Sequence, residues 1–502
     1  MTRTLTCSSA LALVLFATAA SAAVTPQEVW DNWQAMSTAA GQDLTVGATT
    51  PTATGLEVTD VVITYKDQMG GSSSVSFSKL TFADNGDGTV AVTMPDSYPI
   101  ALAFPAEADG PGTLKLTVSQ PGVKITAGGS STETSYQIAA ATTAITLDEV
   151  TDDSGKVLDT EGDLTMTDLT ANYLVSRDGE TTVLDASFGA KSAVLNVSGK
   201  EPEGSNSGKA TVSFADLTGT TKGNFLNAEM MANMATALNS GFTMDSAFGF
   251  GALSMDFDIT DANGPTKLVA NASAGGFNLA MNKAEMTYGT ALQGARFLVS
   301  GAEIPFPEVE VGFADSAFNL RMPLSKSDQP QDFAYLTKVV DLTVSEDIWN
   351  LFDPAATLSR EPATFILDTK GSGFWYQDIM DPGVDIGTIE TPGELHTFDL
   401  AQFLIKAAGA EVSAAGALTF DNADRETFGG VPRPEGLITV GIKGVNKLVE
   451  NLIALGILTE DDATGFRMGL AVFARPGAGP DELTSEIEFK DGGLFANGQQ
   501  LQ

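Results

Sequence analysis

The chain has 502 residues, of which 43% are hydrophobic and 18% charged, so it can bury a large core and is not an acidic disordered chain. Its formal net charge of −37 disfavours nucleic acid and anionic lipid head groups as partners, because both require a basic surface. Solubility is the simplest reason for this charge, and capture of cations such as calcium is the alternative. With one cysteine and one histidine, the chain cannot form a thiolate or multi-histidine zinc site.

Residues 1–22 predict a secretory signal peptide. Arg3 supplies a positive start, an apolar run extends from Leu11 to Ala20, and Ala20-Ser21-Ala22 matches a small-x-small cleavage pattern. The apolar run is shorter than the roughly 20 residues that a membrane-spanning helix needs. Cys7 precedes the run, which argues against a lipoprotein signal. We therefore expect a periplasmic protein with no transmembrane segment in its mature chain.

The mature chain is expected to open with a short helix. Thr25-Pro26-Gln27-Glu28 is a capping-box pattern with proline at the first helical position. Apolar residues follow at helical spacing, namely Val29, Trp30, Trp33 and Met36. The polar side carries Glu28 and Asp31 instead of basic residues, which favours packing over the end of a sheet over a membrane anchor.

Apolar residues alternate with small or polar residues from about residue 55 to 320, which is the period of half-buried strands. The alternating sets are Val75 and Phe77; Val90, Val92 and Met94; Leu114, Leu116 and Val118; Leu164 and Met166; Val309, Val311 and Phe313; and Phe318, Leu320 and Met322. Turn signals at Asn85–Gly88, Gln120–Gly122 and Asp178–Gly179 separate such runs, and consecutive hairpins imply antiparallel pairing. We predict a mainly β fold, a long curved antiparallel meander sheet, open or half-barrel-like, with a few packed helices.

Two helices are predicted among the strands. The first has Leu226, Met230, Met234 and Leu238 every four residues with Met231 beside them, and core packing is favoured over an adaptable face for apolar ligands. The second carries Val445, Leu448, Val449, Leu452 and Ile453, and Gly456 is placed to end it. A linker at Asp328–Pro330 places a boundary near residue 323. The mature chain then divides into a β-rich region, 23–322, and a C-terminal β-rich region with helices, 323–502.

No catalytic, cofactor, metal or binding residue is predicted. A Ser-His-Asp triad would need His396, but the sequence has no Gly-x-Ser-x-Gly motif to supply its serine. Ser76-Phe77-Ser78-Lys79 matches the Ser-x-x-Lys motif of some serine acyltransferases, but it lies in an alternating strand, where positions three apart face opposite sides. Acidic clusters lack the spacing of a calcium loop. Their members are Asp152, Asp153, Asp159, Glu161 and Asp163, and Asp84 and Asp87 around Gly86. A carboxylate-dependent hydrolase remains an alternative, because 64 acidic residues guarantee accidental pairs.

The last third of the chain carries a family resemblance. Its ordered segments are Ser345–Pro354, Leu358, Arg360, Pro362-Ala363, Gly409-Ala410, Gly416, Pro434-Glu435-Gly436, Gly444–Leu448 and Asp491–Gln499. Over about residues 320–500 they resemble an uncharacterised exported bacterial family, catalogued as domain of unknown function twenty-one twenty-five. More distantly, the chain is similar to AsmA-like envelope proteins, whose long curved sheets with an apolar inner face are linked to envelope assembly and lipid handling. The resemblance implies no activity, cofactor or catalytic residue.

Three residues within that segment have expected structural roles. Asp353-Pro354 should end a short helix, Trp349 should be a buried apolar anchor that clasps the two regions together, and Arg360 should pair with an acid. The favoured function is a non-enzymatic periplasmic protein that binds a hydrophobic ligand or lipid on an apolar sheet face. An envelope scaffold that binds other proteins is the second hypothesis, and the hydrolase is the third.

Overall fold

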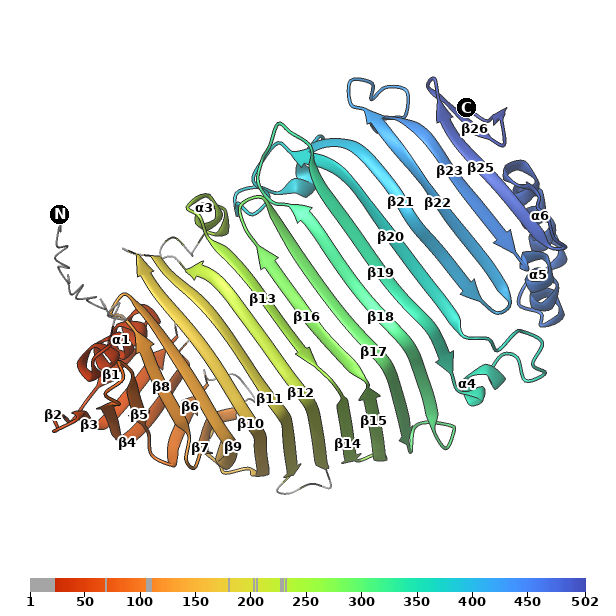
Figure 1. The fold of residues 1–502 in the computed structure, drawn as a ribbon. Helices are drawn as coiled ribbons and strands as arrows, with labels where there is room; N and C mark the ends of the chain where they lie inside the picture. Colours follow the sequence, from red (N-terminus) through yellow and green to blue (C-terminus); the bar gives the residue numbers. More distant parts are fainter. Residues whose placement is uncertain are drawn as a thin grey trace, which may run out of the picture.

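The computed structural model describes residues 23–502 except 68–69, 105–110, 179–180, 202–203, 205, 226–229 and 231–232. The expected signal peptide, Leu226 and Met231 therefore lie outside the described residues. The described chain forms one sheet of 27 strands with helices at its ends and edges (Figure 1). All the strand pairings are antiparallel apart from one isolated parallel bridge between Lys326 and Trp375, so the predicted antiparallel β fold is confirmed.

The strands of the first half are β1 (Asp43–Thr45), β2 (Ala48–Pro51), β3 (Gly55–Lys66), β4 (Ser72–Asp84), β5 (Val90–Thr93), β6 (Ser97–Ala103), β7 (Pro111–Ser119), β8 (Lys124–Gly129), β9 (Glu133–Asp152), β10 (Asp159–Asp178), β11 (Thr181–Lys200), β12 (Ser207–Phe225) and β13 (Thr243–Phe250). The second half has β14 (Leu253–Asp261), β15 (Gly264–Ala272), β16 (Ala274–Met281), β17 (Glu285–Gly301), β18 (Val309–Pro323), β19 (Gln331–Val344), β20 (Ala363–Trp375), β21 (Gly393–Ala407), β22 (Ala410–Asp421), β23 (Arg433–Lys443), β24 (Arg475–Pro476), β25 (Glu482–Lys490), β26 (Gly493–Ala496) and β27 (Gln499–Gln500). The helices are α1 (Pro26–Ala39), α3 (Met234–Asn239), α4 (Glu346–Asn350), α5 (Val445–Ala454) and α6 (Glu460–Phe473), with a 3-10 turn at Ile386–Thr388.

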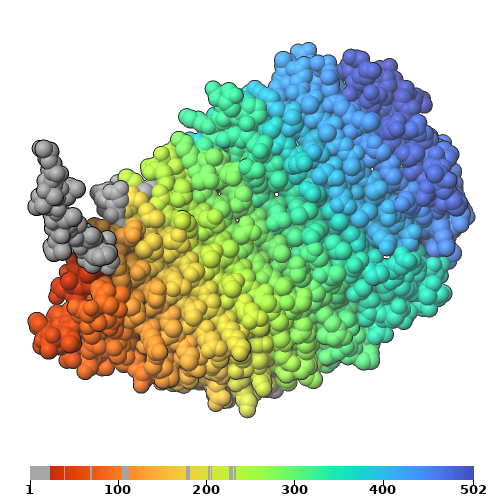
Figure 2. Space-filling model, in the orientation of Figure 1, coloured from red at the N-terminus to blue at the C-terminus, as the bar shows by residue number. Residues whose placement is uncertain are grey.

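The strands follow one another as a meander along the length of the molecule. Some rows of the sheet hold two short strands end to end, as where β13 and β14 both pair with β12. The same holds for β7 and β8, so Gln120–Gly122 is a break within a row and not the hairpin turn that we expected. In the space-filling view the colours progress steadily from one end to the other (Figure 2). No described pairing joins β1 or β2 to the C-terminal strands, so the described sheet is open.

A line of bends crosses the sheet near the middle of the long strands. The bend residues have left-handed backbone: Asp60 in β3, Asp168 in β10, Asp216 in β12, Gly294 in β17 and Asp341 in β19. Their φ values lie between +49° and +57°, a region that disfavours most side chains other than Gly, Asn and Asp. In β10 the pairing with β11 passes from Thr167 to Thr170 without a change of register. The bends therefore divide each row into an upper half, containing β13 and β16, and a lower half, containing β14 and β15 (Figure 1).

The apolar positions switch between odd and even numbers across this line. In β18, for example, Val309, Val311 and Phe313 alternate in the lower half, whereas Phe318, Leu320 and Met322 alternate in the upper half. The two sets nevertheless lie on one face of the sheet. Phe214 of the lower half and Phe250 of the upper half have ring centroids 5.3 Å apart, which side chains on opposite faces cannot achieve. The bend thus keeps one face apolar along the whole strand.

Helix α1 covers this apolar face at its N-terminal end. The predicted capping box is present, because Thr25 accepts from the Glu28 amide and Glu28 accepts from the Thr25 amide at 2.8 Å. Trp30 and Trp33 pack on Phe82, with centroid distances of 5.7 and 5.5 Å. The core around them includes Val29, Leu56, Val58, Leu80, Val90 and Ala127. The prediction of a helix packed over the end of the sheet is confirmed.

Helices α5 and α6 lie at the C-terminal end of the sheet, where α5 contacts β22 and α6 (Figure 1). The predicted helix that starts at Val445 is α5, and Gly456, with φ +70°, follows its last turn as expected. Helix α6 was not predicted. The expected boundary near residue 323 falls between β18 and β19, which pair with each other from Arg321 to Val311, so the sheet runs through it without interruption.

Candidate functional site

The most unusual surface of the molecule is the apolar face of the sheet between β10 and β23. Its upper half includes Tyr173, Leu184, Phe188, Phe248, Phe277, Tyr288, Phe318, Tyr335, Phe365 and Phe403. Its lower half includes Leu164, Leu195, Phe214, Met255, Leu268, Phe297 and Val311. No described helix contacts the middle of this face, and Phe277 is 47% exposed there. We call this surface the apolar face.

Aromatic rings lie along the apolar face in chains of contact. Phe188, Phe248 and Phe277 come from different strands, with successive centroids 6.3 and 5.7 Å apart. The ring of Phe188 lies over Gly219, where a Cβ would stand 1.9 Å from Phe188 Cε1. A further chain joins Tyr288, Phe318 and Tyr335. Glycine beneath an aromatic ring lets the ring lie flat against the sheet, which makes a smooth apolar surface.

The opposite face is polar and carries ion pairs between neighbouring strands. Lys222 and Asp185 are 2.9 Å apart, and Arg321 lies 2.7 Å from Glu285. These side chains are exposed, so each pair adds little stability and mainly keeps this face soluble. The two faces therefore differ sharply in chemistry.

Helix α3 lies at the upper edge of the apolar face, in a packed cluster that is rich in methionine. Ala237 and Leu238 of this helix are buried against Phe242, Met281 and Leu324. Met234, Met244, Met286, Met322 and Met380 pack around them. The methionine-rich helix is therefore part of a packed cluster, as the favoured interpretation of its sequence expected.

A pocket of about 440 Å³ opens beside this cluster, at the upper ends of β18–β21. Leu320, Met322, Phe333, Tyr335 and Trp375 contribute to its lining, so it continues the apolar face. The indole of Trp375 donates to the Pro323 carbonyl at 2.9 Å and is held in place. The ring of Phe333 lies over Gly371, where a Cβ would stand 2.5 Å from Phe333 Cζ. The pocket has the volume and apolar character of small-molecule sites.

Glu394 and Arg425 are among the residues that line the pocket, and polar neighbours of Glu394 lie beside the lining. Glu394 accepts a hydrogen bond from the Tyr376 hydroxyl at 2.7 Å, and this bond, aided by burial, raises the pKa of the tyrosine. His396 lies 3.2 Å from the other Glu394 oxygen and stacks on Phe374 with centroids 5.6 Å apart. Arg425 completes the group. We call this site the Arg425 pocket.

The loop between β22 and β23 carries Arg425 to the pocket. Asn422 donates to the Leu395 carbonyl at 2.7 Å, and Arg425 Nη2 donates to the Gly393 carbonyl at 3.3 Å. Arg433 braces the base of the loop through Asp421 at 2.8 Å, and its hydrogen bond lowers the pKa of that carboxyl. Sequence reasoning missed Arg425, because an arginine between Asp424 and Glu426 looks like an ordinary solvated charge.

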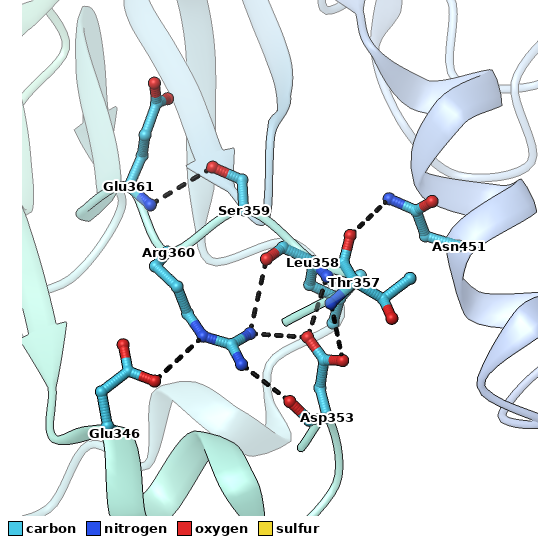
Figure 3. Close-up of polar contacts among 8 residues, drawn as sticks. All are labelled: Glu346, Asp353, Thr357, Leu358, Ser359, Arg360, Glu361 and Asn451. Carbon is cyan, nitrogen blue, oxygen red and sulfur yellow. Dashed lines mark hydrogen bonds and ion pairs between the residues drawn. The ribbon is translucent and has the colours of Figure 1, made fainter. Parts of the chain in front are cut away.

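The segment after α4 forms a second polar centre (Figure 3). The side chain of Asp353 is fully buried and accepts from the Thr357 and Leu358 amides, each at 2.8 Å. Arg360 donates to the Asp353 carboxylate at 2.6 Å and to its carbonyl at 2.7 Å. Burial alone would raise the pKa of Asp353, but the amide and guanidinium hydrogen bonds outweigh it and lower the pKa to about 2. Asn451 of α5 donates to the Thr357 carbonyl at 3.0 Å, which ties this turn to the C-terminal helices.

The expectation of a buried Trp349 is wrong. Helix α4 has no buried residue, and Trp349 is half-buried between Phe352 and the Arg360 guanidinium, which lies 4.5 Å from its ring. The turn that follows the helix supplies the buried anchor instead. That anchor is Asp353, and the predicted pairing of Arg360 with an acid is confirmed.

The other residues considered from the sequence lie in ordinary structural positions. Ser76 and Lys79 are in β4, and Lys79 pairs with Glu57 at 3.3 Å. Asp152 accepts from the Lys156 amide and the Ser154 hydroxyl within its own turn. Within the described parts of the chain, no three His, Cys, Asp or Glu side chains come together as a metal site would require. None of the described helices combines the length and the apolar character needed to cross a membrane.

Fold and site together define an open, curved β-sheet protein with one uncovered apolar face. Residues 259–501 match the model of a family described as an uncharacterized protein conserved in bacteria (DUF2125), so this part of the chain is similar to that family. The match covers the strands from the end of β14 onward, including the Arg425 pocket and the Asp353 centre. No curated protein and no solved structure matches the chain.

Proposed function

We propose that this protein is exported to the periplasm and binds a hydrophobic ligand or lipid along the apolar face, without catalysing a reaction. The observation that carries the proposal is the exposure of aromatic side chains along a face that no described helix covers in its middle. A soluble protein seldom leaves so large an apolar surface open unless something binds there. The signal-peptide pattern of residues 1–22 supports the location.

Removing two exposed rings is expected to weaken binding of a neutral apolar dye. In the double variant Phe188→Ser, Phe277→Ser, the dissociation constant for Nile red should rise about thirtyfold, because each of the two aromatic contacts contributes on the order of 1 kcal/mol. Fluorescence titration measures this change. Asn278→Ala is the matched control, because Asn278 is also exposed but lies next to Phe277 in β16 and thus points to the opposite face. Equal affinities for the two variants would contradict binding on the apolar face.

A second candidate function is an envelope scaffold that docks other proteins, and α6 favours it. Phe466, Met468, Val472 and Phe473 of this helix are all exposed. Crosslinking in cells should then trap a protein partner through α6, and serine at Phe466 and Phe473 should abolish that crosslink. A crosslinking pattern that is unchanged by the two substitutions would count against docking through this helix.

A further inference from the structure

We infer that the Arg425 pocket selects a single-chain amphiphile with an anionic carboxylate head. The inference rests on the proposed function and gives the class of its ligand. The chain of the amphiphile lies on Leu320, Phe333 and Tyr335, and its carboxylate pairs with the guanidinium of Arg425.

The first argument is that Arg425 makes no ion pair with a described residue. Among the arginines whose side chains the structure describes, Arg425 alone makes no ion pair. This is unusual in a chain with 64 acidic residues against 27 basic ones. Within the described part of the chain, Nη2 is the one guanidinium nitrogen of Arg425 with hydrogen-bond partners, the Gly393 carbonyl and Asn422 Oδ1, both at 3.3 Å. Both contacts are to neutral oxygens, and no described carboxylate lies within ion-pair distance of the guanidinium.

The neighbouring acid does not neutralise Arg425. Glu394 also lines the pocket, but its carboxylate accepts from Tyr376 at 2.7 Å and lies 3.2 Å from His396. These contacts direct the Glu394 carboxylate to its own partners and leave the guanidinium available. A carboxylate can bind a guanidinium through two parallel hydrogen bonds, which are stronger than neutral ones.

The place of Arg425 in the fold is the second argument. The loop of β22–β23 holds it where the apolar face ends in the pocket, so one ligand can reach both the charge and the rings. The net charge of −37 repels anions from the rest of the surface. A compact head with one negative charge therefore fits this site better than a head group with more negative charges, which the Glu394 carboxylate of the lining would repel.

Calorimetric titration of the full mature chain with dodecanoate and with dodecan-1-ol tests the inference, because the two ligands share a chain and differ in charge. We expect dodecanoate to bind about tenfold more tightly than the alcohol. Arg425→Gln should remove that advantage, and a far-ultraviolet circular dichroism spectrum like that of the unaltered protein shows that the variant is folded. Arg467→Gln, in α6, is the matched control and should retain the advantage.

The possible results distinguish the carboxylate inference from the proposed function. Equal binding of both ligands, or a dodecanoate preference that survives Arg425→Gln, would overturn the carboxylate inference and leave binding on the apolar face standing. Failure of both ligands to bind the unaltered protein would overturn the carboxylate inference together with the proposed function.

Discussion

Phe82→Ala is expected to lower the free energy of unfolding by about 3–5 kcal/mol, as is usual when a buried phenylalanine is truncated. Phe82 is 1% exposed and lies beneath Trp30 and Trp33, so its removal leaves a cavity where α1 meets the sheet. Such a loss is a large share of a total stability of about 5–15 kcal/mol. Urea unfolding followed by tryptophan fluorescence measures it, because two of the four tryptophans contact this ring.

The control for this prediction is Phe277→Ala, which removes the same atoms from the uncovered part of the apolar face. Phe277 is about half exposed, so its truncation leaves no closed cavity and should cost about 1 kcal/mol or less. Similar losses in the two variants would mean that the apolar face is packed against something and that our account of it is wrong.

Asp353→Asn is expected to lower the thermal midpoint by several degrees at pH 7. The substitution removes the charge that balances Arg360, and the new amide NH2 group faces a backbone N–H or the guanidinium where an acceptor is needed. Glu346→Gln is the control, because Glu346 contacts the same arginine at 3.5 Å but is largely exposed. Differential scanning fluorimetry compares the variants. Equal shifts in the thermal midpoint would show that the burial of Asp353 adds nothing to its contribution to stability.

The same carboxylate predicts a dependence on pH. Its pKa is about 2 in the folded chain, below the ordinary 3.8, so its ionised form stabilises the fold fully above about pH 4. That stabilisation is lost as the pH falls through the folded pKa. The difference in midpoint between the unaltered protein and Asp353→Asn should therefore narrow between about pH 4 and pH 2. A constant difference over this window would contradict the assignment.

Structural features that depend on a few neighbouring residues could be predicted directly from the sequence. The capping box at Thr25 satisfies its own amides, so it marks the start of α1 whatever surrounds it. Alternation in β4, β7, β10 and β18 predicted strands, because one wet face and one apolar face leave a period of two. The methionine-rich stretch was weaker evidence, since methionine packs equally well in a core and in a binding face.

A sequence pattern also marks the line of bends, although no bend was predicted from it. In β18 two alternating sets of opposite parity follow each other within one continuous strand. Asp168-Leu169, Asp216-Leu217 and Asp341-Leu342 mark three of the bends with the same pair of residues. A single aspartate in a strand looks like a polar-face residue, and only the positive φ shared by several strands reveals a structural feature.

Local periodicity and residues close together in the chain were enough to predict the mainly β fold, the opening helix, the strand pattern and the family resemblance. The tertiary structure decided which apolar side chains stay uncovered, because exposure depends on whether another element packs above them. It also buried Asp353 and left Trp349 half-exposed, and it placed Arg425 on the same pocket as Leu320. Residues so far apart in the chain come into contact only when the strands have paired, so no local sequence pattern predicts the contact.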